Sequence, residues 1–169
     1  MKTPTGFHRY LYQDIPWEAQ LVGITGARGI GKSTMIRQYI LGNQDKGRFL
    51  YVSADHTYFA DHRLSDLADE FVKDGGTHLF IDEVQFTTKV VDKENGNIAV
   101  TIYDMLNELK AYKSLDVYVT GSNSKFLSTD ILSEFRGRGD EVRVYPLNYA
   151  EFVSAFEGSK EEAWKNYYT

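Results

Sequence analysis

The sequence is constrained most strongly by one glycine-rich stretch, Gly26-Ala27-Arg28-Gly29-Ile30-Gly31-Lys32-Ser33. The stretch satisfies the pattern G-x-x-x-x-G-K-[ST] at every specified position, and a short apolar run precedes it at residues 21–25. Residues 32–41 follow with helical character, so the sequence predicts a buried strand, a tight loop and a helix in that order. That order is the structural context that a phosphate-binding loop requires.

The loop has the chemistry of a triphosphate-binding site. Its glycines allow the backbone to fold tightly with its N–H groups directed inward, at the positive end of the following helix dipole. Lys32 is expected to reach the β- and γ-phosphates, and the hydroxyl of Ser33 is expected to bind Mg²⁺. The competing interpretation, a glycine-rich turn without a ligand, is disfavoured by the flanking strand and helix. The residues expected to contact the nucleotide are Gly26, Ala27, Arg28, Gly29, Ile30, Gly31, Lys32, Ser33 and Thr34.

A second informative stretch is the apolar run at residues 78–81, which leads directly into Asp82 and Glu83. Acidic residues commonly end strands at the surface, so this pair alone is a weak signal. Its position, one predicted strand and one predicted helix after Ser33, strengthens the signal, because in phosphate-loop proteins such a strand ends beside the nucleotide. We predict that Asp82 holds the Mg²⁺ water shell and that Glu83 is the general base that polarises the attacking water.

The periodicity of the whole chain predicts an α/β fold. Short runs rich in β-forming residues predict five strands, at residues 21–25, 49–53, 78–81, 116–120 and 141–145. Helical patterns lie between these runs. Five strands that alternate with helices specify a parallel sheet covered on both faces, with ligands at the carboxyl ends of the strands. This rule places Lys32, Asp82, Glu83 and Ser122 on one rim of the sheet.

Several boundaries of the helices and of one insertion are also predicted. Asp61 is expected to cap the second helix, and Asn148 is expected to cap the last helix of the fold with Glu151 as its capping-box partner. Residues 85–97 have alternating character around Asn95-Gly96, a favoured two-residue turn, and therefore predict a small β-hairpin.

Two further polar segments lie where they can approach the phosphates. The fourth predicted strand leads into Ser122 and Asn123, and either residue can sense hydrolysis if that strand lies between the other two motif strands. Arg136 and Arg138 lie on a glycine-flexed turn before the fifth strand. They suit bidentate contact with phosphate oxygens, in trans if chains assemble side by side. A solvated turn in which these arginines pair with neighbouring carboxylates is an equally good interpretation.

Composition limits the classes of function. The 169 residues correspond to one domain, and 19 Lys and Arg against 24 Asp and Glu give a net charge of -5, which argues against direct binding to nucleic acid or to an anionic membrane. The absence of Cys excludes disulfides, thiolate metal sites and a Cys nucleophile. With no apolar segment of signal-peptide or membrane-spanning length, the sequence predicts a cytoplasmic protein without a membrane segment.

The two ends of the chain carry aromatic residues. Near the start, an apolar-rich lead that includes Phe7 and Trp17 is predicted to pack as a helix or loop over the sheet edge, in preference to stacking on an adenine. At the end, residues 159–169 look like the beginning of a helix, with Ser159 as its N-cap and Glu162 as the capping-box partner. We therefore expect an ATPase domain at residues 1–158 and the start of a truncated C-terminal extension at residues 159–169.

Five segments, in order along the chain, carry a family resemblance. They are Gly26-Ala27-Arg28-Gly29-Ile30-Gly31-Lys32-Ser33, Leu79-Phe80-Ile81-Asp82-Glu83-Val84-Gln85, Val119-Thr120-Gly121-Ser122-Asn123, Phe135-Arg136-Gly137-Arg138 and Pro146-Leu147-Asn148-Tyr149-Ala150-Glu151-Phe152. Together they resemble a family of bacterial and archaeal AAA-type P-loop ATPases that carry a C-terminal domain of unknown function. The resemblance extends over residues 7–156, and five motifs in the same order are far more specific than any one of them.

The resemblance implies a five-stranded, AAA-like parallel sheet of order 5-1-4-3-2. It implies Walker A at residues 26–33, Walker B at Asp82 and Glu83, a sensor at Ser122 or Asn123, and an arginine finger at Arg136 or Arg138. The sequence departs from the family in two respects. The C-terminal domain is absent, and residues 85–97 are longer than the tryptophan-containing turn of many members.

Three functions are compatible with these features. The leading hypothesis is an ATP hydrolase that converts ATP to ADP and phosphate with Mg²⁺, slowly in isolation if the arginine comes from a neighbouring chain of a homo-oligomer. The second is a nucleotide-gated module in which ATP and ADP states reposition the C-terminal domain on a partner. The third, a small-molecule phosphotransferase, is disfavoured because Asp82 and Glu83 together favour water as the acceptor.

Overall fold

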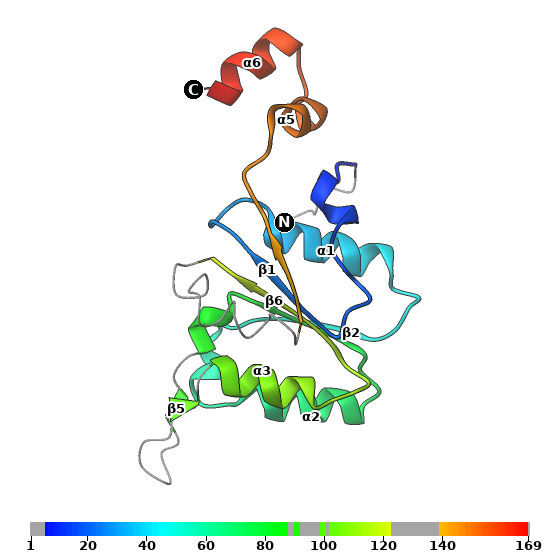
Figure 1. The fold of residues 1–169 in the computed structure, drawn as a ribbon, viewed down its shortest axis with the longest axis vertical. Coiled ribbons are helices and arrows are strands. Elements are labelled where there is room, and N and C mark those ends of the chain that lie inside the picture. The colour runs from blue at the N-terminus through cyan, green and yellow to red at the C-terminus, as the bar shows by residue number, and fades with distance from the viewer. Residues whose placement is uncertain (1–5, 88–89, 92–98, 101, 123–138, 169) are drawn as a thin grey trace.

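A five-stranded parallel sheet forms the centre of the computed structural model, which describes residues 6–87, 90–91, 99–100, 102–122 and 139–168 (Figure 1). The strands are β1 (Leu21–Thr25), β2 (Phe49–Ser53), β3 (His78–Asp82), β6 (Asp116–Gly121) and β7 (Asp140–Arg143). Their spatial order is β2-β3-β6-β1-β7, and every neighbouring pair is parallel. Counted along the chain, this is the predicted order 5-1-4-3-2, so the fold prediction is confirmed.

Strand register aligns the carboxyl ends of four strands at one edge of the sheet. Thr25 at the end of β1 lies opposite Gly121 of β6, and Ser53 at the end of β2 lies opposite Asp82 of β3. All five residues of β1 and of β3 are buried, as expected of parallel strands with helices on both faces. The loops that leave these four strands therefore meet at a single edge.

Helices cover the two faces of the sheet (Figure 1). The helix α1 (Lys32–Gly42) lies on one face, while α2 (Leu64–Lys73) and α3 (Ile102–Lys110) lie on the other. Alternate strand residues enter two separate cores. The α1 core includes Val22, Ile24, Phe80, Tyr118, Met35, Ile36 and Tyr39, and the α2 and α3 core includes Leu79, Ile81, Val117, Val119, Ala68, Leu106 and Leu109.

The N-terminal segment packs against the sheet layer as predicted, but on the α1 core and not over the sheet edge. It contains a 3-10 turn, η1 (Tyr10–Gln13), after which Ile15 is buried and Trp17 stacks on Tyr39 with 4.1 Å between ring centroids. Trp17 also donates from Nε1 to the carbonyl of Tyr12 at 3.0 Å. These contacts make Trp17 a packing residue of the core.

Some local predictions differ from the structure. Asp61 does not cap α2, because it is the C-cap of a second 3-10 turn, η2 (Thr57–Ala60), and the extended residue Arg63 precedes the helix instead. The fifth strand begins at Asp140 and ends at Arg143 rather than running from 141 to 145. Residues 85–87, predicted as the start of the hairpin, belong instead to a 3-10 turn, η3 (Val84–Thr87).

A short antiparallel pair does form in this region, between β4 (Val90–Val91) and β5 (Ala99–Val100), so its second strand lies beyond the predicted range of 85–97. Its turn at Asn95-Gly96 lies outside the described residues. Within the part of the chain that the structure describes, no helix combines the length and the apolar composition needed to cross a membrane.

Two short helices at the C-terminal end pack on each other beyond the edge of the sheet (Figure 1). These are α5 (Tyr149–Ala155) and α6 (Lys160–Tyr168). The side chain of Asn148 caps α5 and Glu151 completes the capping box, as the sequence predicted. Aromatic rings join the two helices, with 5.2 Å between the centroids of Tyr149 and Trp164 and 5.4 Å between those of Phe152 and Tyr167.

Candidate functional site

The loop at residues 26–33, hereafter the 26–33 loop, connects the buried strand β1 to the first turn of α1. Its three glycines have positive φ angles, +142° at Gly26, +82° at Gly29 and +96° at Gly31, which other residues adopt at a cost. Gly31 is the N-cap of α1. The loop therefore turns back over the helix N-terminus, where unpaired N–H groups and the helix dipole favour an anion.

Gly26 is the most constrained of these positions. A Cβ added there would lie 2.3 Å from the carbonyl oxygen of Val144. We expect Gly26→Ala to destabilise the protein by about 1–3 kcal/mol, because both the positive φ and the contact must be relieved. Urea unfolding measures the effect.

The matched control is Gly42→Ala, which should be neutral or slightly stabilising, since Gly42 has no atom within 4 Å of a built Cβ and no positive φ. Equal stability of the two variants would contradict the prediction.

Lys32 lies beneath the loop and is only 5% exposed. Its Nζ donates to the carbonyl oxygens of Gly26 at 2.9 Å and of Ala27 at 2.8 Å. Burial lowers the pKa of Lys32, and the negative charges of Glu83 and Asp82 counteract only part of that effect. The ammonium group is thus partly desolvated and close to two carboxylates, in a position where an added anion would stabilise its charge.

Asp82 ends β3 and is 6% exposed. Its carboxylate accepts hydrogen bonds from the hydroxyls of Thr120 and Tyr51. Burial acts to raise the pKa of Asp82, but hydrogen bonds from Ser33, Thr120 and Tyr51 and the charge of Lys32 outweigh it, so the pKa lies below its usual value. Burial and the hydrogen bond to Asp82 raise the pKa of Tyr51 to about 12, so this hydroxyl is a neutral donor. Asp82 is therefore a carboxylate at neutral pH.

Glu83 has an unusual backbone conformation for a residue other than glycine, with φ +53°. Its amide N donates to Oγ1 of Thr120 at 3.0 Å, so one buried hydroxyl contacts both acidic residues. The carboxylate of Glu83 accepts a hydrogen bond from Oγ of Ser122 at 2.7 Å and another from the amide of Gln85. The conformation of Glu83 is thus determined by side chains from β6 and η3.

A cavity of about 330 Å³ lies beside the 26–33 loop, on the side of the N-terminal segment. Its walls come from the loop, from α1, from residues 7–9 and from the connection between β7 and α5. The wall is largely apolar and includes Phe7, Ile30, Met35, Pro146 and Leu147, with Arg9, Thr34 and Gln38 as its polar side chains. Its volume is that of a small ligand pocket.

The fold brings together a subset of the residues predicted from sequence. Lys32, Ser33, Asp82, Glu83 and Ser122 lie at the aligned ends of β1, β3 and β6 and interact with one another. The predicted sensor Asn123 and the predicted arginines Arg136 and Arg138 lie outside the described residues.

Three polar residues of this site were missed from sequence, namely Tyr51, Thr120 and Gln85. Thr120 is fully buried in β6. Its position directly after the run Val117-Tyr118-Val119 is the one local signal that points to it. Tyr51 lies between two apolar residues of β2, and Gln85 lies in the 3-10 turn η3 just after Glu83. Tyrosine is common in strands, so Tyr51 shows its role only through its contact with the adjacent strand.

Comparison with known proteins agrees with this fold. An uncharacterized protein of Methanocaldococcus jannaschii is 29% identical over 139 residues, which are 77% of this chain and 27% of that protein. A DNA replication initiation factor is similar in structure, with a TM-score of 0.53 and 19% identity over 92% of this chain and 51% of the other. AMPPCP-bound DnaA from Aquifex aeolicus also has a TM-score of 0.53, with 20% identity over 92% of this chain and 52% of that one.

These similarities are partial in extent. The chain spans about a quarter of the M. jannaschii relative and about half of each of the two solved structures. A family model described as an AAA domain matches residues 18–153, which include the 26–33 loop, the acidic pair at the end of β3 and all five strands of the sheet. The chain belongs to the AAA domain family and is an AAA-type P-loop NTPase domain.

Proposed function

We propose that this domain binds ATP with Mg²⁺ at the 26–33 loop and hydrolyses it to ADP and phosphate. The observation that carries the proposal is the convergence of the Lys32 ammonium group with the carboxylates of Asp82 and Glu83 at the carboxyl ends of the strands. Structural likeness to AMPPCP-bound DnaA supports a nucleoside triphosphate as the ligand.

The phosphates would be held by the loop and by Lys32. Inward N–H groups of the loop and the N-terminus of α1 would donate to phosphate oxygens. Nζ of Lys32 would exchange its bonds to the carbonyls of Gly26 and Ala27 for bonds to the β- and γ-phosphates. Arg28, which is exposed on the loop, would lie at the outer side of the phosphate chain.

The donor set suits Mg²⁺, which prefers oxygen ligands and keeps several waters of its own. Ser33 supplies a hydroxyl and Asp82 a carboxylate that is ionised at neutral pH, and the two are already hydrogen-bonded to each other. When bound, Mg²⁺ would neutralise charge on the β- and γ-phosphates. Thr120 and Tyr51 would keep the Asp82 carboxylate in place while it holds the water shell of the ion.

Glu83 would act as the general base. Its carboxylate would accept a proton from the attacking water while the water oxygen bonds to the γ-phosphorus and the bond to the β-γ bridging oxygen breaks. Ser122 and Gln85 orient this carboxylate, and the Ser122 hydroxyl could signal the loss of the γ-phosphate by changing partners. We retain Asn123 as an alternative sensor and Arg136 or Arg138 as an arginine finger, supplied in trans by a second chain.

The nucleoside would occupy the 330 Å³ cavity, next to the loop that holds the phosphates. Phe7 is the aromatic residue of that wall, so it could stack on the adenine. Trp17 is not a candidate for this role, because it stacks on Tyr39 instead. We further propose that residues 1–158 form the ATPase domain and that residues 159–169 are the start of an extension. We also propose that the protein is bacterial or archaeal, has a C-terminal domain and is located in the cytoplasm.

Titration with a fluorescent ATP analogue tests the proposal. We expect saturable binding that strengthens with Mg²⁺, competition by unlabelled ATP and ADP, and phosphate release in a coupled assay. The release can be slow, since an arginine finger from a neighbour contributes about 10³- to 10⁵-fold in rate. A folded sample that binds no ATP, ADP or GTP in the presence of Mg²⁺ would refute the proposal. Binding without turnover would leave a nucleotide-gated switch as the function.

A further inference from the structure

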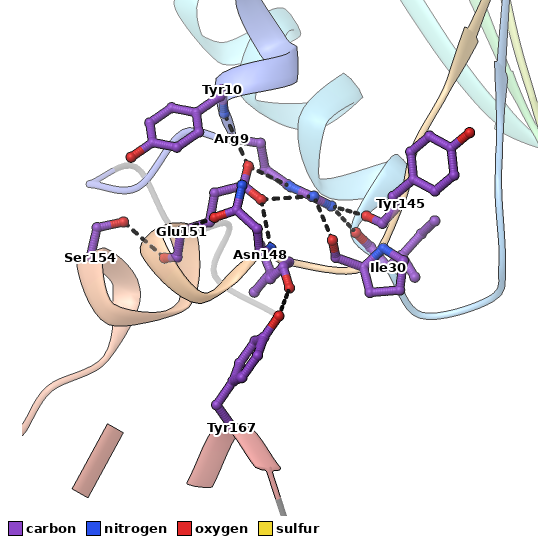
Figure 2. Close-up of polar contacts among 10 residues, drawn as sticks. Arg9, Tyr10, Ile30, Tyr145, Asn148, Glu151, Ser154 and Tyr167 are labelled. Carbon is purple, nitrogen blue, oxygen red and sulfur yellow. Dashed lines mark hydrogen bonds and ion pairs between the residues drawn. The ribbon is translucent and has the colours of Figure 1, made fainter. Parts of the chain in front are cut away.

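A buried ion pair joins the N-terminal segment to the helix α5. The guanidinium of Arg9 and the carboxylate of Glu151 lie 142 residues apart in sequence and meet at 3.0 Å, with side chains that are 9% and 3% exposed (Figure 2). Few ion pairs in proteins are this deeply buried, because desolvation costs more than an isolated pair regains. Such a pair is stable only when both partners have all their hydrogen-bonding groups satisfied.

Arg9 satisfies this condition with five hydrogen bonds, the number of donors that a guanidinium has. Nε and Nη2 donate to the two carboxylate oxygens of Glu151 at 3.1 and 3.0 Å. Nη1 donates to the carbonyl of Ile30 at 3.0 Å and to that of Tyr145 at 2.8 Å, and Nη2 also donates to the carbonyl of Pro146 at 3.3 Å (Figure 2). One side chain therefore connects the 26–33 loop, the segment that follows β7, and α5.

Glu151 is equally saturated. Besides Arg9, its Oε1 accepts from the amide N of Tyr10 and its Oε2 accepts from the amide N of Asn148, both at 3.1 Å. Burial acts to raise the pKa of Glu151, but the hydrogen bonds from Arg9, Asn148 and Tyr10 outweigh it and hold the pKa below its usual value. Glu151 is thus both the capping-box residue of α5 and the counter-ion of Arg9.

Two of the three carbonyl groups that Arg9 binds, those of Ile30 and Pro146, belong to residues that line the cavity proposed for the nucleoside. Arg9, Ile30, Pro146 and Leu147 all line it. Ile30 lies between Gly29 and Gly31, so a displacement of its carbonyl would change the positions of the loop amides. On the other side, Leu147 accepts a hydrogen bond from the hydroxyl of Tyr167 on α6 at 2.9 Å, which links the same wall to the C-terminal helices (Figure 2).

We propose that Arg9 and Glu151 form a clasp that positions the 26–33 loop for nucleotide binding and makes nucleotide affinity depend on the seating of α5 against the core. This inference rests on the proposed nucleotide site and concerns its regulation. Because coupling between two sites is reciprocal, a nucleotide that requires the clasp must also stabilise α5 in its docked position. A partner that pulled α5 and α6 away would correspondingly release the nucleotide.

Hydrogen exchange of the wild-type protein with and without a non-hydrolysable ATP analogue and Mg²⁺ is the first test, and it needs no variant. We expect the nucleotide to slow amide exchange in residues 149–155 as well as in the 26–33 loop. If the analogue binds and slows exchange in the loop but leaves α5 unchanged, the clasp is refuted and the nucleotide site stands. If the analogue does not bind at all, the proposed function falls and the clasp falls with it.

Two conservative variants test the clasp by affinity. Arg9→Lys keeps the charge but has three donors instead of five, and Glu151→Gln keeps the shape but not the charge. We expect each to bind the analogue at least about tenfold more weakly, the change that corresponds to a loss of about 1.4 kcal/mol of binding free energy. The nucleotide should also no longer slow exchange in α5, a readout that a purely structural role would not affect.

A matched control is available in the exposed pair of Arg63 and Glu108, whose side chains are 46% and 40% exposed at a separation of 3.2 Å. Arg63→Lys and Glu108→Gln should leave the affinity unchanged, because an exposed pair far from the loop contributes little. Folded Arg9→Lys and Glu151→Gln proteins with wild-type affinity would overturn the proposal. If either variant does not fold, the exchange experiment on the wild-type protein still decides.

Discussion

Replacement of Lys32 by alanine is expected to weaken the binding of Mg·ATP between about tenfold and a hundredfold and to abolish measurable hydrolysis. The estimate follows because a hydrogen bond to a charged group is worth about 1.5–3 kcal/mol, and the nucleotide would lose such bonds at its β- and γ-phosphates. Hydrolysis should suffer more than binding, since charge on the phosphoryl oxygens shifts as the transferred group leaves. Titration with a fluorescent ATP analogue and a phosphate-release assay measure the two effects.

The fold should tolerate this change. Burial already lowers the pKa of Lys32, so the folded protein gains little from the buried charge when no anion is present. We therefore expect the melting temperature without nucleotide to stay within a few degrees of the wild-type value, and the rise that nucleotide produces to disappear. Lys73→Ala, at the exposed C-terminal turn of α2, is the matched control and should change neither quantity. Wild-type affinity in Lys32→Ala would refute the assignment of the phosphate site.

Glu83→Gln is expected to reduce the rate of ATP hydrolysis at least about 100-fold, the lower end of what a positioned general base contributes. Binding of ATP should stay within about twofold of wild type, because in the proposed site the loop and Lys32, and not Glu83, hold the phosphates. An amide at this position can still accept the hydrogen bond from Ser122, so the local structure should be retained. Only the ability to take a proton from water is removed.

Single-turnover hydrolysis measured beside equilibrium binding separates these two effects. Glu70→Gln on the exposed surface of α2 removes one carboxylate far from the site and should leave both the rate and the affinity unchanged. Normal turnover by Glu83→Gln would exclude Glu83 as the base. A loss of binding that parallels the loss of turnover would instead indicate that Glu83 shapes the phosphate pocket.

The helices and strands around the site could be predicted from the sequence wherever a short-range pattern specifies them. The boundaries of β1 and β2 match the predicted ranges, and Asn148 and Glu151 form the predicted capping box. A strand depends on a run of about five residues, and a cap depends on a donor and an acceptor three residues apart, so the local sequence contains the required information. The prediction that Asp61 caps α2 was wrong for a similar local reason. The 3-10 turn before it, η2, has Asp61 as its own C-cap.

The contacts that complete the site depend on residues that are distant in sequence. Thr120 and Tyr51 reach Asp82 because β6 and β2 flank β3 in parallel register, and a shift of one residue would turn each side chain to the opposite face. Glu151 was expected as a helix cap, but its ion pair with Arg9 appears only when the N-terminal segment folds back across the β7–α5 connection. Short-range patterns thus identified the 26–33 loop and the acidic pair. The side chains that orient these residues were selected by strand pairing and by the return of the N-terminal segment, because those partners become neighbours only in the folded protein.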